Sequence, residues 1–273
     1  HPPGKTTAYL KYVPGRGPSP WRRGGVQYKR VIPYYHVDKV EETFGFLSRK
    51  SPHYIHFCPV RYITISMVPD EFVRRIYLPE IRLSSILSSP KDELETEVVE
   101  LVELLSSTSG VDDGFGITGS ILIGLHDPKL SDIDLTIFGR KRAERVKRSI
   151  LDLVSEGREL RRLKGESEKM WREQISEAFH LGLEEVRIIA ERRWNYAVFK
   201  RRPFSIHPIR EDEEISEKYG ERIYRPLGRC HLEAEVVDPR EAIFMPAVYR
   251  IRVREVLDGP EECWEASEVV SFE

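Results

Sequence analysis

GSILIGLHDPKLSDIDL, residues 119–135, is the stretch that decides the fold. A short apolar strand is predicted over residues 114–119, and one helical turn begins at Ser120 and ends at His126-Asp127-Pro128. A second strand is predicted over residues 132–138, because polar and apolar side chains alternate there. Strand, tight turn, helical turn and strand within so short a stretch favour an α/β arrangement.

The turn at Gly119 and Ser120 has the composition of a phosphate-binding turn. A glycine and a serine between a strand and a helix start let backbone amides approach a phosphate closely, and the helix N-terminus adds a favourable partial charge. The alternative is a serine that only begins a helix.

Asp132 and Asp134 stand two residues apart on the predicted strand. Side chains at that spacing project from the same face, with about 7 Å between the Cα atoms. Hard divalent cations take oxygen ligands, and two metal ions about 4 Å apart clamp attacking and leaving oxygens. The pair therefore predicts a site for Mg²⁺ or Mn²⁺ with a triphosphate. A solvated strand end is the alternative.

A Gly-Ser turn followed a dozen residues later by Asp-x-Asp on a hydrophobic strand resembles the signature of the polymerase-β nucleotidyltransferase superfamily. The resemblance implies that Gly119 and Ser120 bind the triphosphate and that Asp132 and Asp134 hold the catalytic metals. Ser131 stands where the family often places a small residue, so it joins the expected nucleotide-binding set. Within the superfamily, the stretch is similar to uncharacterised archaeal proteins that carry this domain.

One position departs from the pattern of the family. Active members usually carry a third acidic residue, the general base, on a later strand that corresponds here to residues 204–209. Ser205 and His207 occupy the alternating positions of that strand, and neither is a carboxylate. His207 is a weak candidate for the base because imidazole accepts a proton near neutral pH; a buried structural histidine is the alternative. The acidic residues further on lack a matching context: Asp212, Glu233, Glu235 and Asp238.

Around this stretch we expect three parts. The core, residues 91–215, is expected to be α/β (α+β), with the mixed sheet of a nucleotidyltransferase fold flanked by helices. An extended and α+β segment, 1–90, precedes it, and a β-rich appendage, 216–273, follows it. Helices are expected over 37–47, 69–77, 91–109, 141–155 and 158–182, and further strands over 54–67, 194–199, 204–209, 230–237, 243–256 and 269–272.

The composition excludes several classes of protein. Forty-three basic residues balance 45 acidic ones, and 40% of the chain is hydrophobic, which excludes a disordered polyelectrolyte and a membrane protein. Three cysteines exclude a disulfide scaffold and a four-thiolate zinc site. With no signal-peptide pattern, a cytoplasmic protein is expected. One asparagine and two glutamines are typical of a thermophile.

Two basic regions suggest a polyanionic partner. Arg140–Arg148 holds six basic residues in nine, and Arg192–Arg202 interleaves basic with aromatic residues. Near a polymerase-like site such regions would bind RNA or DNA. Solvated helix faces explain them equally well.

The predicted function is metal-dependent transfer of a nucleoside monophosphate from NTP to a hydroxyl acceptor, with nucleic acid as one candidate acceptor. The alternative is a catalytically degenerate nucleotide- or nucleic-acid-binding protein on the same fold, because the third carboxylate is missing. Acceptor, base preference and oligomeric state do not follow from the sequence.

Overall fold

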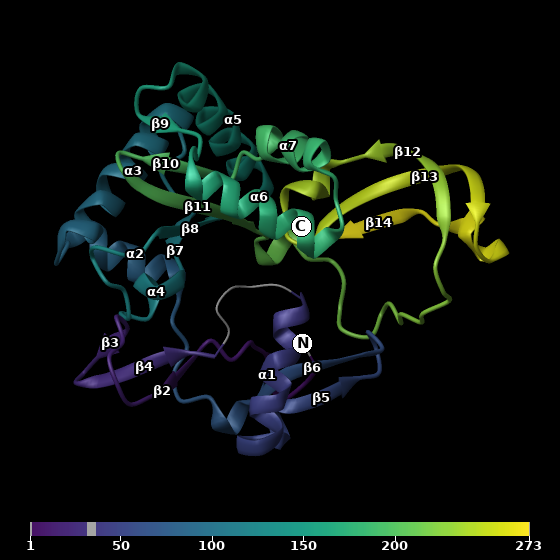
Figure 1. Cartoon of the computed structure of the whole chain (residues 1–273), viewed down its shortest axis with the longest axis horizontal. Helices are drawn as coiled ribbons and strands as arrows, with labels where there is room; N and C mark the ends of the chain where they lie inside the picture. The colour runs from purple at the N-terminus through teal and green to yellow at the C-terminus, as the bar shows by residue number, and fades with distance from the viewer. Residues whose placement is uncertain (1, 32–36, 273) are drawn as a thin grey trace. The chain divides into compact units, whose positions relative to one another are not determined.

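A computed structural model describes residues 2–31 and 37–272 (Figure 1). The chain divides into two compact units. One unit takes residues 77–214 with 243–245, and the other takes residues 1–76, 215–242 and 246–273. The division of the sequence into 1–90, 91–215 and 216–273 stays a prediction. Among the described residues, no helix is both long enough and apolar enough to cross a membrane.

The 77–214 unit is built on a five-stranded sheet in the order β7–β8–β11–β10–β9. β8 and β11 run parallel, and the other neighbouring strands are antiparallel. The mixed sheet expected from the sequence is therefore confirmed. The strands are β7 (Phe115–Ile117), β8 (Ile133–Phe138), β9 (Leu160–Arg161), β10 (Tyr196–Phe199) and β11 (Arg202–Ile209).

Helices flank this sheet, as predicted, and supply most of its core. They are α2 (Pro79–Ser88), α3 (Glu93–Ser109), α4 (Gly119–Leu122), α5 (Arg140–Glu156), α6 (Glu166–Phe179) and α7 (Leu183–Arg192). Apolar residues at helical spacing on α3 and α5 pack with Ile133, Leu135 and Ile137 of β8, all three fully buried. The alternation on β8 leaves Asp134 outside this cluster, so the core fixes the strand that carries the site.

One predicted helix is too long and another is wrong. Of the helix expected over residues 158–182, only α6 is helical, because Gly157 ends α5 in a left-handed conformation, β9 follows, and α6 begins only after Gly165. The helix expected over 69–77 is only a 3₁₀ turn at Asp70–Phe72. The helix α2, which begins at Pro79, was not predicted from the sequence.

The other unit contains three small sheets and the helix α1 (Val37–Lys50). The expected strands at residues 54–67 and in the C-terminal part are confirmed. The sheets are β1–β6–β5, with β1 (Lys5–Thr7), β6 (Ile63–Pro69) and β5 (Ile55–Cys58); β2–β4–β3, with β2 (Tyr12–Pro14), β4 (Val26–Arg30) and β3 (Arg22–Arg23); and β12–β13–β14, with β12 (His231–Asp238), β13 (Ala247–Asp258) and β14 (Glu268–Ser271).

Candidate functional site

Gly119 lies directly against the strand that carries the aspartates. Its φ is +65°, a conformation that favours glycine, and a Cβ atom added there would overlap the carboxylate of Asp134. The amide of Thr118 donates to the carbonyl oxygen of Asp134 at 2.8 Å. The turn predicted to bind phosphate and the strand predicted to hold metal therefore meet at one place.

Asp134 presents its carboxylate at this junction, and Asp132 lies two residues before it on the chain. Asp132 is exposed just before β8, and Asp134 is half-buried on it. Burial raises the pKa of Tyr196, and the negative charges of Asp132 and Asp134 raise it further against the opposing charge of Arg193, so both carboxylates act on this tyrosine electrostatically. Carboxylate oxygens beside a glycine turn are a donor set that fits a divalent cation.

Ser120 and Ser131 close the loop between the turn and the aspartates. Ser120 is buried, and its hydroxyl donates to that of Ser131 at 3.3 Å. The Ser131 hydroxyl also accepts from the Asp127 amide at 3.0 Å, and the Leu125 amide donates to the Ser120 carbonyl at 2.9 Å. The structure thus brings the two predicted serines together, and both side chains take part in holding the loop.

Two arginines from distant segments hold this loop in place. Arg202 on β11 donates to the carbonyl oxygens of Ser131 at 2.6 Å and Pro128 at 2.9 Å, and it pairs with Glu97. Arg82 on α2 donates to the carbonyl oxygen of Ile121 at 3.2 Å. Arg202 was expected on a nucleic-acid surface and Arg82 was not predicted, because no local pattern in the sequence links either arginine to the loop.

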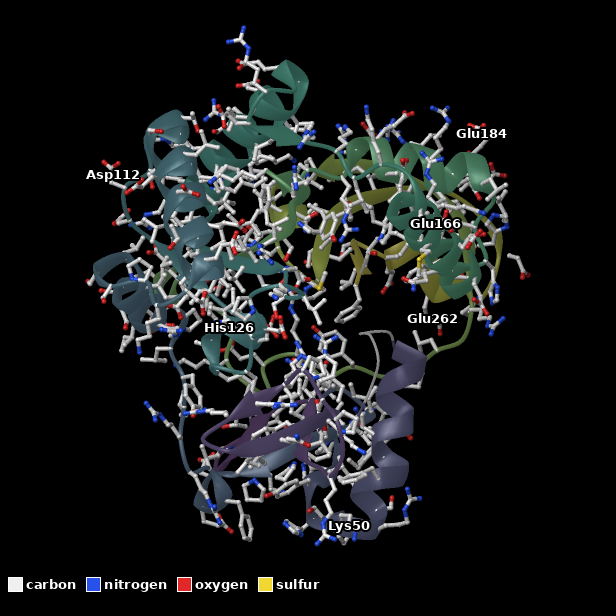
Figure 2. All side chains as sticks on the ribbon, turned by 60° about the vertical axis from the view of Figure 1, so that its left-hand side comes forward. Lys50, Asp112, His126, Glu166, Glu184 and Glu262 are labelled. Carbon is white, nitrogen blue, oxygen red and sulfur yellow. The ribbon has the colours of Figure 1, made fainter. Side chains whose placement is uncertain are left out.

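A second set of possible cation ligands lies next to this loop. Carboxylate oxygens of Asp92 and Glu95 and a ring nitrogen of His126, which is labelled in Figure 2, lie within 4.8 Å of one another. Each group already has a structural role. Asp92 caps α3 by accepting from the Glu95 amide at 2.9 Å and also bonds His126 Nε2 at 2.9 Å. Buried Glu95 pairs with Arg82, so this set fits a loop anchor better than a metal site.

Titration behaviour agrees with the anchoring role of Asp92. Partial burial acts to raise the pKa of this carboxyl, but the hydrogen bonds from Glu95 and His126 outweigh it and hold the pKa below its usual value. Asp92 is therefore a charged cap at neutral pH.

Ser205 stands where the family usually has its third carboxylate. Parallel pairing of β8 with β11 puts Ser205 opposite Asp134, and the Ser205 hydroxyl donates to Asp134 Oδ1 at 2.7 Å. His207 Nε2 lies 2.9 Å from the same hydroxyl oxygen. Because the serine proton goes to the carboxylate, Nε2 carries the hydrogen in this contact. The three side chains form a line from His207 through Ser205 to Asp134.

His207 is held in its neutral form. Burial lowers its pKa, and Arg193 lowers it further, while the charge of Asp134 opposes them. Of the acidic residues considered as substitutes for the third carboxylate, Asp212 lies in a 3₁₀ turn after β11, and Glu233, Glu235 and Asp238 belong to β12 in the other unit.

The two predicted basic regions are mostly engaged within the protein. On α5, Arg142 pairs with Asp113 and Glu211, and Arg145 donates to the carbonyl oxygens of Ser109 and Gly110. In the later region, Lys200 pairs with Glu100 and Arg202 with Glu97. These contacts favour the structural explanation of both regions.

Arg193 lies in a pocket beside Tyr196. Its guanidinium lies over the rings of Trp171, 4.9 Å to the centroid, and Tyr196, 4.7 Å to the centroid. Arg162, Glu168 and Glu191 also line this pocket. The helices α6 and α7 both contribute to its lining, and their first turns carry the labelled Glu166 and Glu184 (Figure 2). Aromatic faces with charges of both signs suit a flat polar ring.

Residues 98–195 match the family model described as nucleotidyltransferase domain. This part of the chain is a nucleotidyltransferase domain of the polymerase-β-like superfamily. The match includes Gly119, Ser120, Asp132 and Asp134 and ends before β11.

The whole chain is also similar to an uncharacterized protein of the archaeon Methanocaldococcus jannaschii, with 27% identity over 281 aligned positions. The alignment covers all of this chain and 78% of that relative. No solved structure matches. The comparisons thus support a nucleotidyltransferase domain and leave its acceptor unnamed.

Proposed function

We propose that the nucleotidyltransferase domain is an active, metal-dependent enzyme that transfers a nucleoside monophosphate from NTP to a hydroxyl acceptor. The observation that carries this proposal is the contact between Gly119 and the carboxylate of Asp134, with Asp132 two residues earlier on the chain. The backbone of the turn and the oxygen ligands of the two aspartates can then bind the same triphosphate. The acceptor oxygen forms a bond to the α-phosphorus, the bond to the β-phosphate breaks, and pyrophosphate leaves.

Each residue has a separate part in this proposal. Amides of the turn at Gly119 and Ser120 bind the β- and γ-phosphates, and Ser131 keeps the turn closed. Asp132 and Asp134 are the ligands for Mg²⁺ or Mn²⁺, which when bound neutralises phosphate charge and polarises the α-phosphate.

Ser205 and His207 orient Asp134 in this scheme. The hydrogen bond from Ser205 occupies Oδ1 of Asp134 and leaves Oδ2 on the side of Gly119. His207 fixes the serine hydroxyl through Nε2, so any proton that it takes from the acceptor goes to its other ring nitrogen, Nδ1. His207 is therefore the candidate for the general base.

A second function rests on the same position. With Ser205 opposite Asp134, no carboxylate stands at the register of the usual third acid. A catalytically degenerate protein that binds a nucleotide or nucleic acid would need only the turn and the aspartate pair. It predicts NTP binding without transfer.

The source and setting of the protein belong to this proposal as well. The near absence of asparagine and glutamine and the archaeal relative support an archaeal, heat-adapted protein. A cytoplasmic location and an RNA or DNA acceptor are consistent with the proposed NTP chemistry.

The test is transfer of label from α-labelled NTPs, with Mg²⁺ or Mn²⁺, to a pool of RNA, DNA and protein acceptors. Asp132→Asn keeps the size of the side chain and removes its charge, so transfer falls at least about 100-fold, the equivalent of a few kcal/mol of lost charge stabilisation. Asp112→Asn, an exposed aspartate at the end of α3 (labelled in Figure 2), is the matched control and keeps the rate.

Two results would contradict the proposal. Tight NTP binding by calorimetry without transfer under any condition favours the degenerate protein. Transfer that survives Asp132→Asn removes the assigned metal ligand.

A further inference from the structure

The N-terminal segment has a charge distribution unlike the rest of the chain. Residues 1–37 contain seven lysines and arginines and none of the 45 acidic residues, although acids make up about one residue in six of the whole chain (45 of 273). Its positive charge is therefore not balanced by neighbours in sequence. A concentrated positive field of this kind attracts polyanions.

The small sheet β2–β4–β3 (Figure 1) arranges aromatic rings and a guanidinium on one face. Antiparallel pairing puts Tyr12 opposite Arg30, and the Trp21 ring lies 5.9 Å from the Tyr12 ring, centroid to centroid. The Arg30 guanidinium lies over both rings, 4.7 Å from the centroid of Trp21 and 5.7 Å from that of Tyr12. These three side chains form what we call the aromatic face.

The rings of this face are not part of a hydrophobic core. Within residues 2–31, Ser19 is the only buried side chain, and Tyr12 and Trp21 keep partial exposure. Around them Arg16, Arg22 and Lys29 are exposed. Partly exposed aromatic rings and exposed cations are the two features by which proteins bind nucleic acid without reading its sequence.

We propose that the sheet β2–β4–β3 is a binding surface for single-stranded nucleic acid. Exposed basic side chains contact the phosphates, and unstacked bases stack on Tyr12 and Trp21. A duplex covers the faces of its bases and would use only the charges, so the aromatic face favours a single strand. The inference uses neither the aspartates nor a metal and stands apart from the proposed catalysis.

The test is fluorescence anisotropy of the full chain with a labelled 20-nucleotide oligo(U), its DNA counterpart and a duplex of equal length. Replacing Arg16, Arg22 and Lys29 together by Gln weakens binding and lowers the slope of log K against log salt by about 2, at roughly 0.7 per phosphate contact on a single strand. Trp21→Ala weakens binding roughly tenfold or more, and Trp21→Phe keeps most of it.

The matched control replaces three exposed basic residues outside the segment by Gln: Arg158, Lys164 and Arg229. It changes the net charge by the same amount and is expected to bind like the unmodified protein. Circular dichroism checks that Trp21→Ala keeps its fold, and Trp21→Phe tests the ring if it does not. Asp132→Asn is expected to bind normally, so failure of the catalytic proposal and failure of this one are distinguishable.

Three results would overturn the inference. The first is a duplex that binds as tightly as the single strands. The second is inorganic polyphosphate that competes equally well at equal phosphate concentration, which would make the surface a site for any polyanion. The third is a control variant that loses as much affinity as the triple variant of Arg16, Arg22 and Lys29.

Discussion

Basic side chains are used in opposite ways in two regions of this molecule. In the 77–214 unit, guanidinium groups face carboxylates and carbonyl oxygens: Arg142 bonds Asp113 and Glu211, and Arg202 bonds Glu97. In residues 1–37 the basic residues share their segment with no acid at all. The denser basic run, Arg140–Arg148, is therefore the more structural one. The positions of the acidic residues therefore indicate a polyanion site better than the number of arginines in a segment does.

The largest effect on stability is expected when Arg202 is replaced. Its side chain and that of Glu97 are only 13% and 16% exposed, so Arg202→Met leaves a nearly buried carboxylate without its partner and frees two carbonyl oxygens of the loop. The expected loss is about 3–5 kcal/mol in the free energy of unfolding, measured by urea denaturation. The double variant Arg202→Met with Glu97→Leu should recover much of it. A loss below about 1 kcal/mol would show that this arginine is not structural.

A smaller effect is expected at His207, whose partly buried ring is neutral and forms no ion pair among the described residues. Burial lowers the pKa of His207 in the folded protein, so the unfolded chain binds the proton first as pH falls below about 6.5. The stabilising contribution of the neutral ring is thus complete above that pH and is lost below it.

His207→Gln removes this titration, so the melting temperature of the variant should change less with pH between pH 8 and pH 5. Equal slopes for the variant and the unmodified protein would contradict the assigned neutral state. His180→Gln, at the C-terminal end of α6, is the control for loss of one histidine.

The smallest effect is expected in the N-terminal sheet. Arg16→Gln with Arg22→Gln removes two exposed positive charges from a segment without acids, so the free energy of unfolding should change by less than about 0.5 kcal/mol. Any change should be stabilising at low salt and vanish at high salt, because it relieves like-charge repulsion. Thermal melts at two salt concentrations measure it. A salt-independent loss would mean that these arginines are structural, like Arg202.

Local features of the site could be predicted from the sequence, and long-range ones could not. Gly119 and Ser120 are adjacent in one turn, and Asp132 and Asp134 stand two residues apart at the start of β8, so spacing along the chain brings together the members of each pair. Pairing of β8 with β11 then placed Ser205, one of the two alternating residues considered, opposite Asp134.

The supports of the loop had no such signal. Arg82 comes from a helix that periodicity did not show, and Arg202 lies 71 positions along the chain from Ser131, whose carbonyl it bonds. The helix expected over residues 158–182 was drawn too long at its start, because the charged composition gave no sign of the strand β9 or of the break at Gly165. Contacts between distant segments depend on the topology of the fold, and local sequence patterns do not show which distant segments become neighbours.

The way the chain is divided between its two units has a consequence for biosynthesis. Residues 77–214 form an almost continuous unit, whereas residues 1–76 belong with segments after residue 214: the Tyr224 amide donates to the Val60 carbonyl at 2.7 Å, and the Tyr219 hydroxyl lies 3.4 Å from Cys58 Sγ. Domains fold as they leave the ribosome. The 77–214 unit can therefore fold before residues 215–273 are synthesised. The N-terminal segment is synthesised first, but it cannot complete its unit until those later residues have been added.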